Sequence, residues 1–110
     1  MSNPVTFVTS AARTVDGQSA AQQAHHGSLD IAVDITAVSG TSPTIDFEIE
    51  WSHDGGTTWA SADPADTFSQ ITAAGTVVKT VPVRAHTWRL TWTLGGSSPS
   101  FTFSADVHNR

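Results

Sequence analysis

The sequence predicts an all-β fold, an antiparallel sandwich of two sheets with seven to eight strands in an immunoglobulin-like or jelly-roll-like arrangement. Three observations lead to this prediction. Apolar and polar residues alternate with a period of two in several short segments, which is the pattern of half-buried strands. Clusters of Gly, Pro, Ser and Asp separate these segments at intervals of about 8 to 12 residues, as in sandwiches and barrels. Helical periodicity is nearly absent, so no helix is expected to cover the sheets.

Four segments show the alternation most clearly. They are Leu29 to Thr36, Ile45 to Trp51, Thr87 to Leu94 and Phe101 to Val107. In each of them the apolar side chains are expected to face the core and the polar ones the solvent, as an antiparallel sheet allows. Three of the four tryptophans, Trp51, Trp88 and Trp92, fall on the inward faces, where each buried ring removes roughly 150 to 250 Å² from water.

Three weaker segments complete the predicted sheets. Val5 to Thr9 adds a strand near the N-terminus, and Phe68 to Thr72 forms a short one. Thr76 to Val83 is expected at a sheet edge, or to bend near its end, because Pro82 has no N–H to donate to a neighbouring strand.

The length of 110 residues predicts one domain. Within it we distinguish residues 1–28, a strand followed by an arm or loop, from a sandwich core over residues 29–110. Residues 16–28 lack periodicity, and we expect a long loop there, with a short helical turn as the alternative. The N-terminal segment is the candidate for a partner-contacting or subunit-swapping arm, and a disordered end is the alternative.

Charge and composition exclude several classes of function. The net charge is -5, and the five cations are spread along the chain, whereas nucleic-acid binding needs clustered Lys and Arg. There is no cysteine, which excludes disulfides and thiolate chemistry. The N-terminus has no basic segment followed by an apolar run, and no apolar stretch has the length of a membrane span. We therefore expect a protein without a signal peptide, made in the cytoplasm and not bound to membranes.

Two segments of the chain echo each other. Gly40 to Phe47 reads GTSPTIDF, and Gly96 to Phe103 reads GSSPSFTF. Since Pro43 and Pro99 fix φ and the glycines permit unusual φ values, each segment is interpreted as a tight connection between antiparallel strands. Two similar hairpin turns are the favoured explanation, and a duplication or a shared contact end is the alternative.

The most specific local string is Ser52 to Trp59, SHDGGTTW. It resembles the Asp box, Ser-x-Asp-x-Gly-x-Thr-Trp, at its five defined positions, which are Ser52, Asp54, Gly56, Thr58 and Trp59. In such a turn the Asp carboxylate accepts backbone N–H bonds, and the Trp ring packs beneath the hairpin. Sialidases carry several copies of this motif, but one copy without an arginine cluster indicates a structural turn, not an active site.

Three acids of one predicted strand, Asp46, Glu48 and Glu50, share a face. Calcium binding is one reading, but a flat strand splays carboxylates apart, so a solvated or intersubunit face is favoured. Arg89 faces outward from its own strand and is expected to pair with one of these acids if the strands are neighbours. The adjacent pair His25 and His26 is interpreted as loop histidines. No nucleophile, general base, metal ligand or cofactor site is predicted.

The order of several strings between Ile31 and Val107 resembles the head decoration proteins of actinobacterial tailed bacteriophages. The strings are Thr41 to Trp51, Ser52 to Trp59, Phe68 to Thr72, Gly75 to Val83, Trp88 to Trp92 and Ser98 to Phe103. The resemblance implies a virion protein on the outer surface of the phage head that binds the major capsid protein and reinforces its lattice. It also implies a homo-oligomer, with a trimer favoured, and brings no catalytic residues.

Two other classes of function remain open. A tail-associated structural domain would share the fold and differ in its location. A carbohydrate-binding module on the virion surface would need an exposed aromatic triad, whereas the inward tryptophans leave no spare ring for stacking on sugars. Under either structural reading, Asp46, Glu48, Glu50, Arg89, Pro43 and Pro99 are the candidate interface residues.

Overall fold

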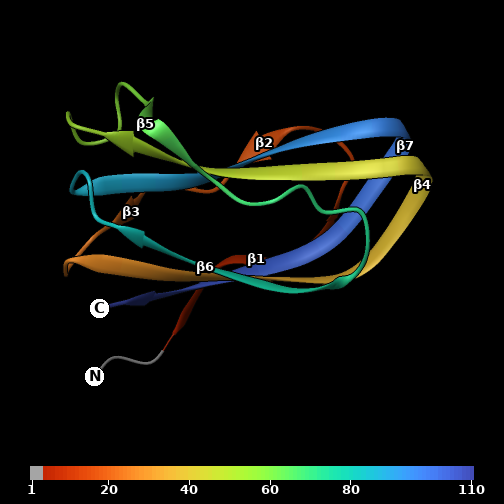
Figure 1. Ribbon diagram of the computed structural model, residues 1–110, viewed down its shortest axis with the longest axis horizontal. Coiled ribbons are helices and arrows are strands. Elements are labelled where there is room, and N and C mark those ends of the chain that lie inside the picture. The colour runs from red at the N-terminus through yellow and green to blue at the C-terminus, as the bar shows by residue number, and fades with distance from the viewer. Residues whose placement is uncertain (1–3) are drawn as a thin grey trace.

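The computed structural model describes residues 4–110, which form seven β-strands and, within this range, no helix (Figure 1). The strands are β1 (Val5–Arg13), β2 (Gly17–Gln18), β3 (Gln22–Gln23), β4 (Ser28–Ser52), β5 (Ala60–Thr67), β6 (Gly75–Pro82) and β7 (Thr87–Asn109). The predicted all-β, antiparallel class is confirmed. A division into two separate sheets is not confirmed, because pairing links all seven strands into one antiparallel sheet.

One long ribbon, formed by β4 and β7, organises this sheet. The two strands run antiparallel from Leu29, opposite Asn109, to Ser52, opposite Thr87. Figure 1 shows both strands bending at the same end of the molecule, so that the ribbon folds back over itself. We call residues 28–39 with 100–109 the first arm, and residues 44–52 with 87–95 the second arm. The four clearest predicted strands are the four segments of these arms, joined in pairs into two continuous strands.

The interpretation of the two Gly-Ser-Pro segments as hairpin turns is wrong, because both lie inside continuous strands, at the bends. Gly40 and Gly96 have φ values of 115° and 100°, and Ser42 and Ser98 follow with 48° and 49°. These left-handed residues turn the strand through a corner without reversing it, and the pairing between β4 and β7 continues on both sides. The segments therefore share one end of the molecule.

Five shorter strands flank the two arms. In the first arm β6 pairs with β4, and β1 pairs with β7 on the other side. In the second arm β5 pairs with β4, and β2 and β3 pair with β7. The edge position predicted for Thr76 to Val83 is confirmed, because β4 is the one strand of the described residues that pairs with β6, and β6 ends at Pro82.

The core lies between the facing arms and contains the side chains that the alternation predicted to face inward. Phe47 of the second arm and Phe103 of the first arm meet edge to face, with ring centroids 5.1 Å apart, a favoured geometry for aromatic pairs. Leu94 is only partly buried. The buried members are Leu29, Ile31, Val33, Ile35, Ile45, Phe47, Ile49, Trp51, Trp88, Leu90, Trp92, Phe101, Phe103, Ala105 and Val107.

Three segments differ from their predicted structure. Residues 16–28, expected as a loop, contain β2 and β3, and the described part of residues 1–28 is built into the sheet through pairing with β7. Met1 to Asn3 lie outside the described residues. The strand β5 was not predicted, because the acids and Pro64 of this segment break the alternation. Phe68 to Thr72 is not a strand, and only Ile71 forms a single bridge there, to Ile45.

Candidate binding surface

The turn between β4 and β5 is held by its own side chains. The Asp54 carboxylate accepts hydrogen bonds from the N–H groups of Thr57 (3.1 Å) and Thr58 (2.9 Å) and from the Ser52 hydroxyl (2.8 Å). The Ser52 hydroxyl in turn accepts the Gly56 N–H at 2.8 Å. The bond from Thr58 first, and then that from Ser52, hold the pKa of Asp54 well below its ordinary value. These contacts are those expected of an Asp-box-like turn.

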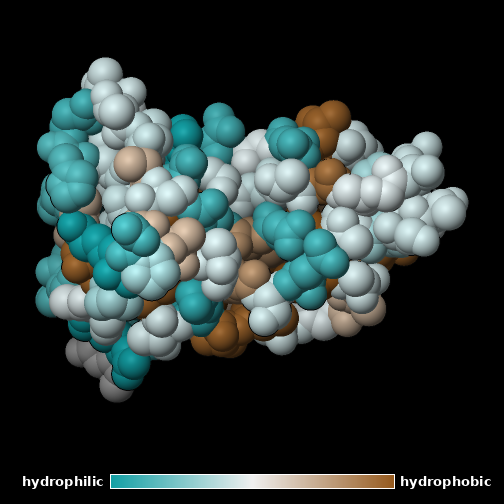
Figure 2. All heavy atoms as spheres, turned by 45° about the horizontal axis from the view of Figure 1, so that its top comes forward, coloured by the Kyte–Doolittle hydropathy of each residue, from teal (hydrophilic) through white to brown (hydrophobic). Residues whose placement is uncertain are grey.

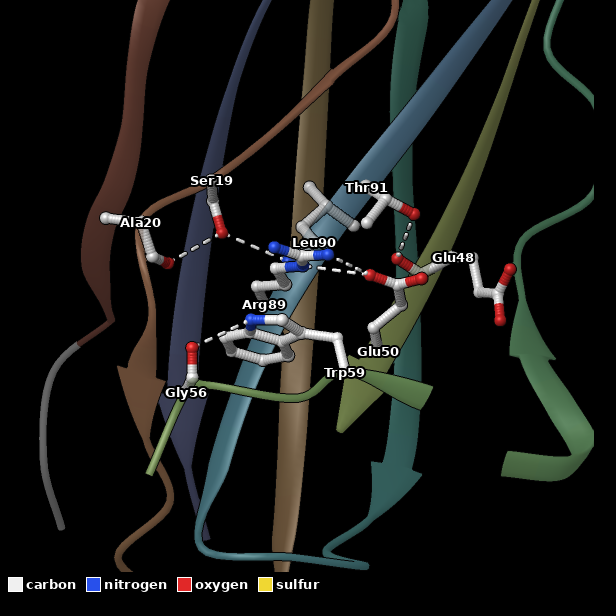
Figure 3. Close-up of polar contacts among 9 residues, drawn as sticks. All are labelled: Ser19, Ala20, Glu48, Glu50, Gly56, Trp59, Arg89, Leu90 and Thr91. Carbon is white, nitrogen blue, oxygen red and sulfur yellow. Dashed lines mark hydrogen bonds and ion pairs between the residues drawn. The ribbon is translucent and has the colours of Figure 1, made fainter. Parts of the chain in front are cut away.

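Trp59 connects this turn to the outer face of the second arm (Figure 3). Its indole N–H donates to the Gly56 carbonyl at 3.1 Å, and the Arg89 guanidinium lies over its ring, 4.3 Å from the centroid. Arg89 also forms an ion pair with Glu50 at 2.7 Å. The ring is half-buried on the outside of the sheet, so it packs beside the turn and over the ribbon, not in the core.

The three acids of the β4 row lie on this same outer face in different settings. Glu50 is paired with Arg89, and Asp46 accepts hydrogen bonds from the Gln70 amide at 3.2 and 3.3 Å. The Oε2 atom of Glu48 is buried and has no hydrogen-bond partner among the described residues. The row therefore presents one neutralised and two uncompensated carboxylates.

A hollow of about 330 Å³ lies beside the two uncompensated acids. Three threonines of neighbouring strands bring hydroxyl groups to the same place. The residues that line it are Asp46, Phe47, Glu48, Thr67, Phe68, Thr91 and Thr93. Here the carboxylates can accept hydrogen bonds from a polar or basic group of a partner, and the threonine hydroxyls can both donate and accept them. We call this part of the outer face, from the hollow to Arg89, the acidic face.

The other candidate interface residues, Pro43 and Pro99, lie away from the acidic face, at the bent end of the ribbon. Figure 2 shows this end, at the right of the view, in pale colours of intermediate hydropathy. The two segments that form it, 37–44 and 95–102, contain no charged residue. We call this end the twin bend. The predicted interface residues thus fall into two separate surfaces, one acidic and one uncharged.

An ion pair between the buried Asp66 and the exposed Arg84, at the end of the ribbon opposite the twin bend, was missed by the sequence reasoning. The Asp66 carboxylate, 6% exposed, accepts hydrogen bonds from both Arg84 nitrogens (2.7 and 2.9 Å) and from the Trp51 indole (2.8 Å). Burial alone would raise the pKa of Asp66, but the bonds from Arg84 and Trp51 outweigh it and lower that pKa. No local pattern marks this pair, because its three members come from three separate segments. Its position, locking β5 to the end of the ribbon, is structural.

Within residues 4–110 no three His, Asp or Glu side chains come close enough together to hold a metal ion. The described part of the chain also contains no helix with the length and apolar character that a bilayer crossing requires. No family model, curated protein or solved structure matches the chain.

Proposed function

We propose that the protein is a structural component of a phage virion, a decoration protein that binds the outer surface of the head and reinforces the major capsid lattice. The order of the sequence strings between Ile31 and Val107 supports the virion assignment. The proposed role is binding without catalysis, and the two surfaces described above are the proposed contacts.

The observation that carries the proposal is the twin bend. Gly40 and Gly96 occupy equivalent positions with positive φ and pack against the opposite strand's backbone, so this end has one conformation set by close backbone contacts. A surface that is already ordered loses little conformational entropy on binding. Because the bend presents the same backbone geometry twice, it is suited to two equivalent sites on neighbouring lattice subunits.

The acidic face is the second proposed contact. Asp46 and Glu48 are uncompensated by any described cation, and they would orient the protein against a basic patch on the capsid. Binding that depends on the exposed Asp46 should weaken as the salt concentration rises, because exposed charges are screened. Homo-oligomerisation, with a trimer favoured, remains part of the proposal and is measured by the mass of the free and bound protein.

Mass spectrometry of virions separated into tail-less heads and tails tests the location. The proposal expects the protein in the heads, and co-sedimentation of the purified protein with expanded capsids. Absence from the heads ends the decoration role, and recovery only with tails would establish the tail-associated alternative.

Two charge-insertion variants test the contact surface. Ser97→Glu places a carboxylate on the exposed, uncharged twin bend, and Ser10→Glu places one at an exposed site of β1, outside both the twin bend and the acidic face. An unpaired charge in an interface costs several kcal/mol, so Ser97→Glu should weaken capsid binding at least about tenfold. Ser10→Glu should bind as the unmodified protein does. Equal binding by both variants would show that the twin bend is not the contact.

Trp59 is the observation that favours carbohydrate binding as a second candidate. It is the one tryptophan outside the core, and it lies on the outer face beside Arg89, which pairs with Glu50 (Figure 3). Stacking on sugar rings needs an accessible ring face, however, and Arg89 covers one face of Trp59. Saturable glycan binding with a change in tryptophan fluorescence, lost in Trp59→Ala, would establish this alternative.

A further inference from the structure

The strands fall into two sets with the same order. Residues 5–52 contain β1, the short pair β2 and β3, and the long strand β4. Residues 60–109 contain β5, β6 and the long strand β7. We call these the first and second halves. Each begins with a strand, crosses to the other arm, forms a second edge strand and ends in a long bent strand (Figure 1).

Each half completes the sheet of the other half. The edge strands β5 and β6 of the second half pair with β4 of the first. The edge strands β1, β2 and β3 of the first half pair with β7 of the second. Within the described residues, every pair of neighbouring strands joins a strand of one half to a strand of the other. The sheet therefore depends on contacts between the halves.

The registers of the two sets agree. Gly17 opens β2 opposite Trp92, and Gly75 opens β6 opposite Ile35. The register of β1 shifts between Thr6 and Val8. The register of β5 shifts at the equivalent place, between Ser61 and Asp66. Equivalent residues thus follow in the same order along both halves, as in a molecule with an internal two-fold axis.

The bends show the same reciprocity at atomic detail. A Cβ atom built on Gly40 would lie 2.7 Å from the Ser98 carbonyl oxygen, and one built on Gly96 would lie 2.5 Å from the Ser42 carbonyl oxygen. Ser42 and Ser98 follow these glycines with nearly equal φ values, 48° and 49°. Each bend therefore packs on the equivalent part of the other strand.

Residues 53–59 are the whole connection between the halves. Trp51 and Ala60 stand opposite each other in the β4 and β5 pairing, so the length of residues 53–59 lets β5 reach β4 of its own chain. The Asp54 and Ser52 hydrogen bonds order this turn. We infer that this turn is a lock on the monomer, and that a second copy of the chain supplies either half when the turn cannot close. The second state is an intertwined dimer in which the first half of each copy pairs with the second half of the other. This inference does not rest on the capsid proposal.

Deletion of residues 53–59 tests the inference in the full chain. Ser52 is then joined directly to Ala60, so β4 and β5 must continue as one strand, and β5 must pair with another copy. The deleted protein should have twice the monomer mass by light scattering and keep its β-sheet circular dichroism. A matched variant, in which seven Gly and Ser residues replace 53–59, loses the Asp54 bonds but keeps the length, and it should stay monomeric.

A disulfide distinguishes an intertwined dimer from two monomers side by side. The chain has no cysteine, and Ala32 of β4 stands opposite Val78 of β6, one in each half. With Ala32→Cys and Val78→Cys, oxidation of the deletion variant should link two chains, whereas oxidation of the full-length protein should give a cross-linked monomer. A folded monomer after the deletion, or a dimer whose disulfide stays within one chain, overturns the inference.

A refolding experiment on the double-cysteine protein with residues 53–59 intact covers the case in which the deletion variant fails to fold. The double-cysteine protein is unfolded, refolded at millimolar concentration under reducing conditions, and then oxidised. Recovery of a folded, disulfide-linked dimer supports the inference, since high concentration favours pairing between copies. If only monomer is recovered and the deletion variant does not fold, the inference is wrong.

Discussion

The first and second halves share a backbone plan but differ in their chemistry. The first half carries six acids and one cation, whereas the second carries three of each. The acids of the first half are Asp16, Asp30, Asp34, Asp46, Glu48 and Glu50, and its cation is Arg13; the second half has Asp63, Asp66 and Asp106 with Lys79, Arg84 and Arg89. Glycine at the bend and inward apolar residues at alternate positions are common to both. Backbone geometry and core periodicity therefore define the fold, and the outward positions are free to differ.

The largest expected effect comes from the bends, where the halves are most alike. Gly40→Ala and Gly96→Ala each place a Cβ within 2.7 Å of a carbonyl oxygen at a positive φ. We expect each change to lower the free energy of unfolding by about 3 kcal/mol, through strain and overlap with backbone. Urea unfolding measures both.

Gly27→Ala is the matched control, because a Cβ at Gly27 meets no atom within 4 Å. It should change the unfolding free energy by less than about 1 kcal/mol. Equivalent bends require effects of similar size. A large loss of unfolding free energy in Gly40→Ala with none in Gly96→Ala would therefore contradict the equivalence of the two bends.

The next effect tests a position where the halves differ. Asp66 pairs with Ile49, and Val8 holds the equivalent place opposite Ala105. Asp66→Ala leaves the Trp51 indole N–H and Arg84 without their acceptor, and we expect a loss of about 2 kcal/mol in unfolding free energy. Adding Arg84→Ala should cost much less than its effect in the unmodified protein. Additive effects of the two changes would show that the ion pair does not couple them.

The dependence of stability on pH is expected from the same carboxylate. The pKa of Asp66 is lower in the folded protein than its ordinary value of 3.8, so its stabilising contribution is complete above that value. This contribution is lost as the pH falls through the folded-state pKa. Urea unfolding at neutral pH and at about pH 3 should therefore show a smaller acid-induced loss for Asp66→Asn than for the unmodified protein. An equal loss would assign the acid sensitivity to other groups, such as Asp54.

The smallest effect is expected on the acidic face. Arg89 and Glu50 are both partly exposed, at 23% and 24% of their side chains, so Arg89→Ala should cost no more than about 1 kcal/mol. Arg89→Lys keeps the charge but loses the planar stack on Trp59. Its unfolding free energy should lie between those of Arg89→Ala and the unmodified protein. A loss well above this range would show that the outward positions also help to define the fold.

The strands that carry strict alternation were predictable, because period-two burial is a local property of the sequence. Every inward residue from Leu29 to Ile35 and from Ile45 to Trp51 is buried. The bends were not predictable as bends, since Gly-Thr-Ser-Pro suits a hairpin equally well, and only pairing with a distant strand decides between them. The strand β5 and the Asp66 ion pair were missed for a similar reason. Their partners, β4 and Arg84, are brought together by the fold and not by sequence spacing.

The interlocked pairing of the two halves is tested most directly by nuclear Overhauser contacts in the isotopically labelled, full-length protein. We predict matched cross-strand contacts from Gly17 to Trp92 and from Gly75 to Ile35, together with contacts from Val5 to Val107 and from Ala60 to Trp51. Contacts from Gly40 to Pro99 should accompany them. Observation of only one contact of each matched pair would contradict the interlocked pairing. So would contacts of a tight hairpin, in which residues on the two sides of Gly40 pair with each other.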